Sequence, residues 1–378
     1  MAPSRPTGKP GSNVAAILDD AETQLAVGNI EAAINLAEQA LENTGPKGDF
    51  ALRALNQLGA YRVENGDIEE AWDVLLKATR LDEDGMVDEK VGGGPDKFLL
   101  LAQISEAGGK DSVDWFIRGA EALRVQLAKL SEITTRTSEQ EFSYLEKQQK
   151  LGATLCSVAE VYMTDLSWED DAETRCEALI TEAMMLAPNS PETWQTVANV
   201  RISQGATEEA QGALKRSLAL WEDLPPEHPA VPEFPTRISL TRLLLEVEME
   251  DNALSVLDRL VTDDDQSVEA WYLGGWCQYI QGEKLRDGGG KSANGNEGTS
   301  DNKWKSTWSS ARRWLATSLK LYEVQEYEDE RLGEHAIELF QSINSELGEP
   351  PEQEDEESDD DNDDDEDKDS GSDEEMHN

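Results

Sequence analysis

Histidine and cysteine, the residues that most often carry out chemistry in proteins, are few in this chain and far apart. The histidines are His228, His335 and His377, and no two of them are spaced to share one helix face. The cysteines are Cys156, Cys176 and Cys277, and they form no CxxC pair. Zinc sites and disulfide frameworks normally show paired or evenly counted cysteines, so this pattern predicts neither and indicates a reducing compartment.

Motifs for nucleotide binding and hydrolysis are also missing from the sequence. There is no GxxxxGK[ST] run, GxSxG elbow or HExxH helix, which are the signatures of phosphate-binding loops, serine hydrolases and zinc proteases. Asp170 and Asp171 could hold a divalent ion loosely, but no EF-hand loop surrounds them, and a solvated turn explains them equally well. We therefore expect no catalytic residue, no metal site and no cofactor, and a binding protein rather than an enzyme.

The charge of the chain points to the kind of partner. The formal net charge is −47, and the stretch from Glu349 onward holds 18 acidic residues against one lysine. A field of this sign repels nucleic-acid phosphates and anionic membranes and attracts basic polypeptides. We expect a basic protein client, with no direct nucleic-acid or membrane contact. The alternative is that the acidity serves only to keep an extended surface soluble.

The elements that would present such a surface are helical hairpins. Residues 21–46, AETQLAVGNIEAAINLAEQALENTGP, read as a helix, a turn at Gly28 and a helix with alanines on one face. Related units follow around Ala71 and Ala210, and a clear first helix, VEAWYLGGWCQYIQG, begins at Val268. The alanine of the second helix recurs at intervals near 34 to 38 residues in the clearest units, with a degenerate unit near Val113. This pattern predicts about seven repeats.

These units resemble the tetratricopeptide repeat, in which a bulky residue is followed by a small one four positions later, a turn glycine and two further alanines. The resemblance implies an all-α, right-handed superhelical solenoid, in which small residues let antiparallel helices approach closely. Residues 328–347, with Leu332, Ala336 and Leu339 on one stripe, are expected to cap it.

Composition sets the expected domain boundaries. We expect residues 1–12 to be a disordered segment, residues 13–348 to form the solenoid, and residues 349–378 to form a disordered acidic tail. Within the solenoid, residues 283–303 are rich in Gly, Ser and Asn, which predicts a flexible insertion. No apolar signal segment and no apolar run of about 20 residues is present, so we expect a soluble, intracellular protein.

The tetratricopeptide resemblance also implies which side chains line the concave groove, because the first helix of each hairpin faces it at fixed offsets from the bulky residue. In the unit at Trp271 these offsets select an aromatic and acidic set that suits Arg and Lys side chains. The same rule, applied to the unit at Trp194 and to the one around Leu155, selects acidic and amide residues, and two positions of the second unit project similarly. The predicted groove residues are Glu269, Tyr272, Trp276, Tyr279, Glu192, Asn199, Glu160, Asp165, Asn56 and Glu64. An alternative for the aromatic members is packing against a neighbouring hairpin.

Taken whole, the repeats, the interrupted last repeat, the capping helix and the acidic tail resemble the fungal assembly chaperones dedicated to large-subunit ribosomal protein L-four. The resemblance implies capture of L-four in the cytoplasm, binding of its long internal basic loop in the groove, and passage with it into the nucleus. We expect a monomer in a one-to-one complex. Two alternatives remain open, a chaperone of histones or another basic nuclear protein, and a general tetratricopeptide adaptor.

Overall fold

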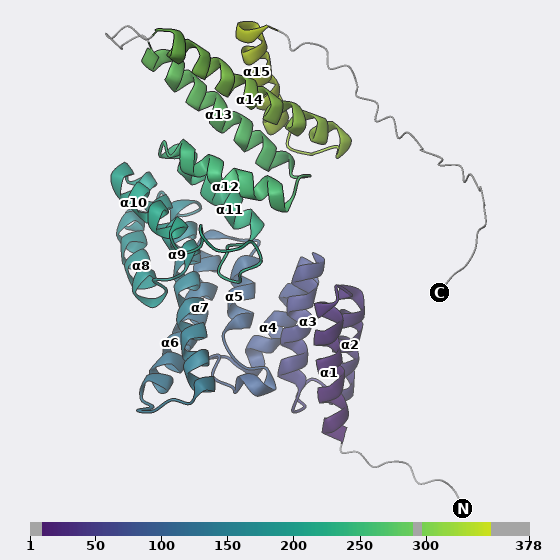
Figure 1. Ribbon diagram of the computed structural model, residues 1–378. Helices are drawn as coiled ribbons and strands as arrows, with labels where there is room; N and C mark the ends of the chain where they lie inside the picture. Colours follow the sequence, from purple (N-terminus) through teal and green to yellow (C-terminus); the bar gives the residue numbers. More distant parts are fainter. Residues whose placement is uncertain (1–9, 290–296, 349–378) are drawn as a thin grey trace, which may run out of the picture.

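The structure is a computed structural model that describes residues 10–289 and 297–348 (Figure 1). Within these residues all regular structure is helical. The elements are α1 (Pro10–Ala26), α2 (Ile30–Thr44), α3 (Ala51–Asn65), α4 (Ile68–Leu81), the 3-10 turn η1 (Glu89–Val91), α5 (Asp96–Gln103), α6 (Gly109–Ser131), α7 (Ser138–Met163), α8 (Ala172–Leu186), α9 (Pro191–Ser203), α10 (Thr207–Leu218), α11 (Phe234–Glu246), α12 (Glu250–Asp263), α13 (Val268–Gly289), α14 (Glu297–Val324) and α15 (Glu330–Leu347). None of these helices is long and apolar enough to cross a membrane.

Within residues 10–289 and 297–348, consecutive helices pair into seven antiparallel hairpins, from α1/α2 to α13/α14, and α15 packs on the last of them. The prediction of an all-α, tetratricopeptide-type solenoid with a terminal helix is confirmed. The degenerate unit near Val113 is the hairpin α5/α6, whose first helix has only eight residues.

Small residues set the close approach of the helices, as the repeat pattern predicts. Ala33, Ala71, Ala210 and Ala253 are completely buried. A Cβ atom added to Gly59 of α3 would lie 2.5 Å from Cδ2 of Leu75 in α4, closer than packed carbon atoms can come. The repeat therefore uses Gly and Ala because a larger side chain would push the two helices of a hairpin apart.

The hairpins follow an arc that is open on one side (Figure 1). The first helices of neighbouring hairpins contact one another, as in α7 with α9 and α11 with α13, whereas no comparable pair of even-numbered helices is found within residues 10–289 and 297–348. Helices that stay in contact lie on the inside of a curve, and helices that spread apart lie on the outside. The concave groove is therefore lined by the odd-numbered helices.

A buried ion pair holds the joint between the second and third hairpins. Lys97 is fully buried, and its Nζ lies 2.7 Å from Oδ2 of Asp82 and 2.6 Å from the carbonyl oxygen of Gly94. Asp82 also accepts hydrogen bonds from the backbone nitrogens of Met86 and Val87. These bonds fix the loop that connects α4 to α5.

The structure corrects two predicted boundaries. Most of the predicted insertion at 283–303 is helical, because α13 continues to Gly289 and α14 begins at Glu297; residues 290–296 lie outside the described residues. Packing explains the difference: the Trp308 ring stacks on Tyr279 at 5.1 Å between centroids, and Arg286 lies 4.8 Å from the centre of the Trp308 ring. Such tertiary contacts override weak local helix propensity.

The second correction is at the amino-terminal end. Helix α1 begins at Pro10, inside the segment predicted to be disordered; proline is favoured in the first turn of a helix because its missing N–H would have no partner there. Residues 1–9 and the acidic tail, 349–378, lie outside the described residues, so their predicted disorder stays a prediction.

Candidate functional site: the concave groove

The amino-terminal third of the groove contains a polar pocket of about 280 Å³ between α3, the α4–α5 loop and α7. The side chain of Asn56 donates a hydrogen bond to the carbonyl oxygen of Gly92, so this predicted groove residue is held by the loop. Arg53 pairs with Asp19 and Glu22 at 2.7 and 3.0 Å. Glu64, by contrast, is exposed at the end of α3.

The basic side chains that line this pocket form ion pairs with neighbouring carboxylates. Lys147 of α7 pairs with Glu89, and Lys150 lies 2.8 Å from Asp96. Four carboxylates and three basic side chains line the pocket, so its local charge is close to balanced.

Glu160 and Asn199 mark the middle of the groove, on the neighbouring first helices α7 and α9. Both are exposed. An oxygen of Glu160 accepts a hydrogen bond from Oγ1 of Thr196, 3.2 Å away and one turn before Asn199. Desolvation raises the pKa of Glu160 above its usual range, and the bond from Thr196 opposes this shift. The groove thus holds a carboxylate that an incoming positive charge would stabilise.

Two other predicted residues of this region have local partners. Glu192 accepts a hydrogen bond from the hydroxyl of Ser190, 2.8 Å away, at the start of α9. Asp165 follows the end of α7 and accepts a bond from the backbone nitrogen of Gly109, 3.0 Å away. Asp165 therefore satisfies the amino-terminal end of α6, where carboxylates are favoured by the helix dipole.

The carboxy-terminal third contains a larger pocket of about 530 Å³ between α11, α13 and α15. Its lining residues are Arg242, Leu245, Glu246, Tyr272, Leu273, Trp276, Ile280, Asp329, Arg331 and Leu332. Tyr272 and Trp276 were predicted to line the groove, and the structure brings them together here. Glu269 lies 2.5 Å from Arg242 and is therefore paired. An apolar floor with two acidic and two basic side chains can bind an apolar anchor flanked by charges.

The predicted aromatic residues also hold the end of the solenoid together. The hydroxyl of Tyr272 lies 2.6 Å from Nδ1 of His335, and the hydroxyl of Tyr279 lies 3.1 Å from that of Ser342. Trp276 meets His335 edge to face at 5.6 Å. Burial raises the pKa of Tyr272 to about 12. Tyr279 is not among the residues that line the pocket, so its observed contacts are those of packing.

Sequence reasoning missed the lining residues of α11 and α15. In α11 the position of the bulky repeat residue is occupied by Arg237, which pairs with Asp263 at 2.6 Å, so the offset rule had no starting point. Counting back twelve residues from Ala253, as from Ala210 to Ala198, would have placed the small residue at Thr241 and the groove residue at Arg242. Asp329 and Arg331 belong to the terminal helix region, which no repeat rule covers.

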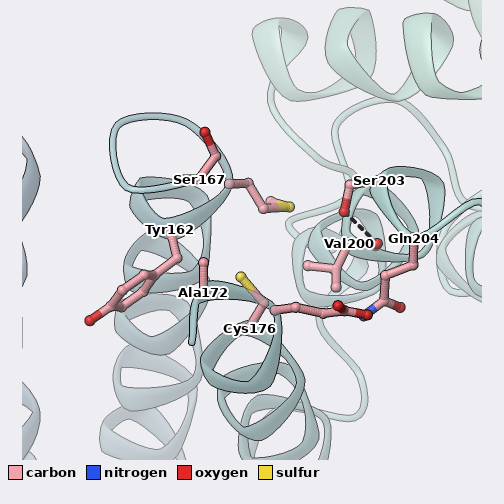
Figure 2. A pocket seen from close by; sticks show the side chains of 9 residues that line it. Tyr162, Ser167, Ala172, Cys176, Val200, Ser203 and Gln204 are labelled. Atoms are coloured by element: carbon pink, nitrogen blue, oxygen red, sulfur yellow. Dashed lines mark hydrogen bonds between the residues drawn. The ribbon is translucent and has the colours of Figure 1, made fainter. Parts of the chain in front are cut away.

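A separate crevice of about 430 Å³ lies where α7, α8 and α9 meet (Figure 2). Figure 2 shows the Cys176 sulfur beside this crevice and the Tyr162 hydroxyl turned away from it. Burial raises the pKa of the Cys176 thiol, and it raises that of Cys156 to about 11 and that of Cys277 to about 12. All three thiols are buried and stay protonated near neutral pH. No cluster of three or more metal-ligating side chains occurs in the described part of the chain.

Similarity to known proteins identifies the family of this chain. No family model matches the chain. A curated protein of Emericella nidulans, described as a probable assembly chaperone of rpl4, is 46% identical over 341 residues, which are 89% of this chain and 83% of the relative. This chain belongs to the family of rpl4 assembly chaperones.

Two further members of the rpl4 assembly chaperone family support this assignment. A Schizosaccharomyces pombe protein with the same description is 31% identical over 319 residues, which are 84% of this chain and 87% of the relative. The solved structure described as the assembly chaperone of RpL4, Acl4 (residues 1–338), matches with a TM-score of 0.68 and 55% identity, and covers 73% of this chain and 99% of that one. The family predicted from the repeats and the acidic tail is therefore confirmed.

Proposed function

We propose that this chain captures ribosomal protein L4 and shields its long, basic internal loop in the concave groove until L4 is incorporated into pre-ribosomes. The observation that carries the proposal is membership of a family whose described members are chaperones of rpl4 assembly. The groove supports it, because its first helices offer an apolar floor, aromatic edges and exposed carboxylates to an extended segment.

In this proposal charge affects binding in two ways, by long-range attraction and by direct contacts inside the groove. The net charge of −47 attracts a basic segment from a distance and speeds its association. Inside the groove, where the pockets are nearly balanced, affinity depends on apolar burial and on a few carboxylates such as Glu160 and Glu246. A basic segment bound in this way is kept from RNA until the denser phosphates of ribosomal RNA displace the chaperone.

The remaining features follow from the same mechanism. Capture and release by charge need no ATP and no cofactor, so we propose a chaperone without catalytic activity. We also propose that it acts as a monomer, bound one-to-one to L4, and accompanies L4 from the cytoplasm to the nucleus. Light scattering of the purified complex measures the stoichiometry directly.

The proposed site is tested with a matched pair of charge reversals. The double variant Glu160→Lys, Glu246→Lys changes two exposed groove positions and should weaken binding of an L4 loop peptide by about tenfold or more. The control Glu70→Lys, Glu208→Lys makes the same change on the outer helices α4 and α10, where both residues are exposed, and should change affinity by less than about threefold. Equal losses in the two variants would reject the groove as the site.

Removing the tail separates this proposal from a chaperone of histones or other basic nuclear proteins. A chain that ends before Pro350 should keep most of its affinity for the loop if the groove provides the contacts. A loss of about a hundredfold, roughly 2.7 kcal/mol, would favour binding driven by the tail. A general adaptor is distinguished by salt, because its affinity would hardly fall between low and high ionic strength.

A further inference from the structure

The outer side of α14 is positively charged, whereas the chain as a whole is strongly negative. Between Lys303 and Val324 there are five basic residues and one acidic residue, in a chain of net charge −47. We define the basic stripe as the exposed residues Lys305, Arg313 and Lys320; the exposed Lys303 flanks its amino-terminal end. Lys305, Arg313 and Lys320 are spaced by eight and seven residues, close to two turns each, so they lie along one side of the helix.

The stripe lacks the carboxylate partners that neutralise other bases nearby. On α13, Lys284 pairs with Glu248 and Glu250 at 2.8 and 2.7 Å. Neither the residues of the stripe nor Lys303 forms an ion pair with a side chain described in residues 14–287 and 303–348. Because α14 is the second helix of its hairpin, the stripe lies on the convex side of the solenoid, away from the groove.

The last residue before the acidic tail, Gly348, lies next to the helix that carries this stripe. Gly348 is the last described residue, and its carbonyl oxygen accepts a hydrogen bond from Nη1 of Arg312 at 2.9 Å. The same guanidinium group lies 3.3 Å from Oδ1 of Asn344 in α15. Arg312 precedes Arg313 in α14, so the last described residue, Gly348, lies beside α14 about midway between Lys305 and Lys320.

We propose that the acidic tail, residues 349–378, docks along the basic stripe of α14 in the same molecule. The stripe from Lys305 to Lys320 is about 22 Å long, and 30 residues of extended chain reach about 100 Å. The tether raises the local concentration of tail carboxylates to the millimolar range, so weak contacts suffice. The tail is thereby held on the convex side and does not compete for the groove. This inference is independent of the identity of the client.

Zero-length carbodiimide cross-linking of the full chain, followed by mass spectrometry, tests the proposal. Tail carboxylates should join to Lys303, Lys305 and Lys320 at low salt, with yields about fivefold lower near 0.5 M NaCl, where exposed charges are screened. Tail cross-links spread evenly over the exposed lysines of the other helices would overturn the proposal.

A charge-reversal variant provides the second arm. Lys305→Glu, Arg313→Glu, Lys320→Glu should reduce the tail cross-link to Lys303 by about fivefold and enlarge the radius of gyration in small-angle scattering. The control Lys77→Glu, Lys215→Glu, Arg216→Glu makes the same change at exposed positions of α4 and α10 and should do neither. An unchanged cross-link in the stripe variant, with binding of a short RNA lost in that variant alone, would make the stripe a nucleic-acid surface and refute tail docking.

Discussion

The hydroxyl of Tyr272 in α13 lies 2.6 Å from Nδ1 of His335 in α15. The two residues are 63 positions apart, and their bond fastens the terminal helix over the carboxy-terminal pocket of the groove. Tyr272, which the repeat pattern assigns to the groove, therefore also fixes the position of α15, which forms one wall of the pocket. Mutations at this site affect stability and binding together unless they are chosen to separate the two.

Tyr272→Phe makes that separation, because it removes the hydroxyl and keeps the ring that lines the pocket. The free energy of unfolding should fall by about 1 kcal/mol, the usual contribution of one hydrogen bond. Urea denaturation measures this change, and a double-mutant cycle with His335→Ala should show coupling between the two positions. Additive effects in that cycle would mean that the bond contributes nothing to stability.

Substitution by alanine should change the stability of the chain in opposite directions at Gly59 and Gly212. A Cβ at Gly59 would lie 2.5 Å from a methyl carbon of Leu75, whereas a Cβ at Gly212 in α10 would meet nothing within 4 Å. Gly59→Ala should destabilise the chain by about 1–3 kcal/mol through overpacking. Gly212→Ala should stabilise it by about 0.5–1 kcal/mol, because alanine has the better helix propensity. Thermal melting of both variants checks the contrast, and a melting temperature raised by Gly59→Ala would contradict the close helix approach.

Lys97→Met should be among the most damaging single substitutions outside the apolar core. It leaves Asp82 buried without its counter-ion, and breaking a buried pair in this way typically costs about 3–5 kcal/mol. The comparison is Lys150→Met, which breaks a partly exposed pair with Asp96 and should cost less than about 1 kcal/mol. Guanidinium denaturation of the two variants gives both values. Equal costs would show that the burial of Lys97 carries no penalty of its own.

Glu160→Gln should increase stability and weaken client binding. Desolvation raises the pKa of Glu160 in the folded chain, so the folded state holds its proton at higher pH than the unfolded state does. Ionisation of Glu160 therefore lowers the free energy of unfolding as pH rises from the unfolded pKa, near 4.5, through the raised folded pKa. The glutamine variant cannot ionise and avoids that loss. Glutamine keeps the acceptor for Thr196.

The stability gain of Glu160→Gln should be present at pH 7 and absent below about pH 4, as followed by urea denaturation across pH. The affinity for an L4 loop peptide at pH 7 should fall by about threefold to tenfold, because a carboxylate that meets a basic side chain is lost. A stability difference that does not depend on pH would contradict the raised pKa.

The hairpins and their order could be predicted from the sequence because each depends on local features. Ala33, Ala71 and Ala210 recur at the helix crossings, and Gly28, Gly66 and Gly205 take positive backbone φ angles at the turns. A small residue at a crossing and a glycine in a left-handed turn are requirements of a single hairpin, so the sequence alone states them. The net negative charge and the family could be predicted for a similar reason, since both depend on the composition of the chain and on the order of its segments.

The tertiary structure decided which side chains the groove leaves available. Glu269 and Arg242, or Tyr279 and Ser342, lie on different helices, and neither residue of a pair predicts the other. The lengths of α13 and α14, the balanced charge of the two groove pockets and the basic stripe beside Gly348 arise in the same way. Each depends on which helices the curvature of the solenoid brings together, and that curvature is the sum of many contacts between hairpins rather than a property of any one repeat.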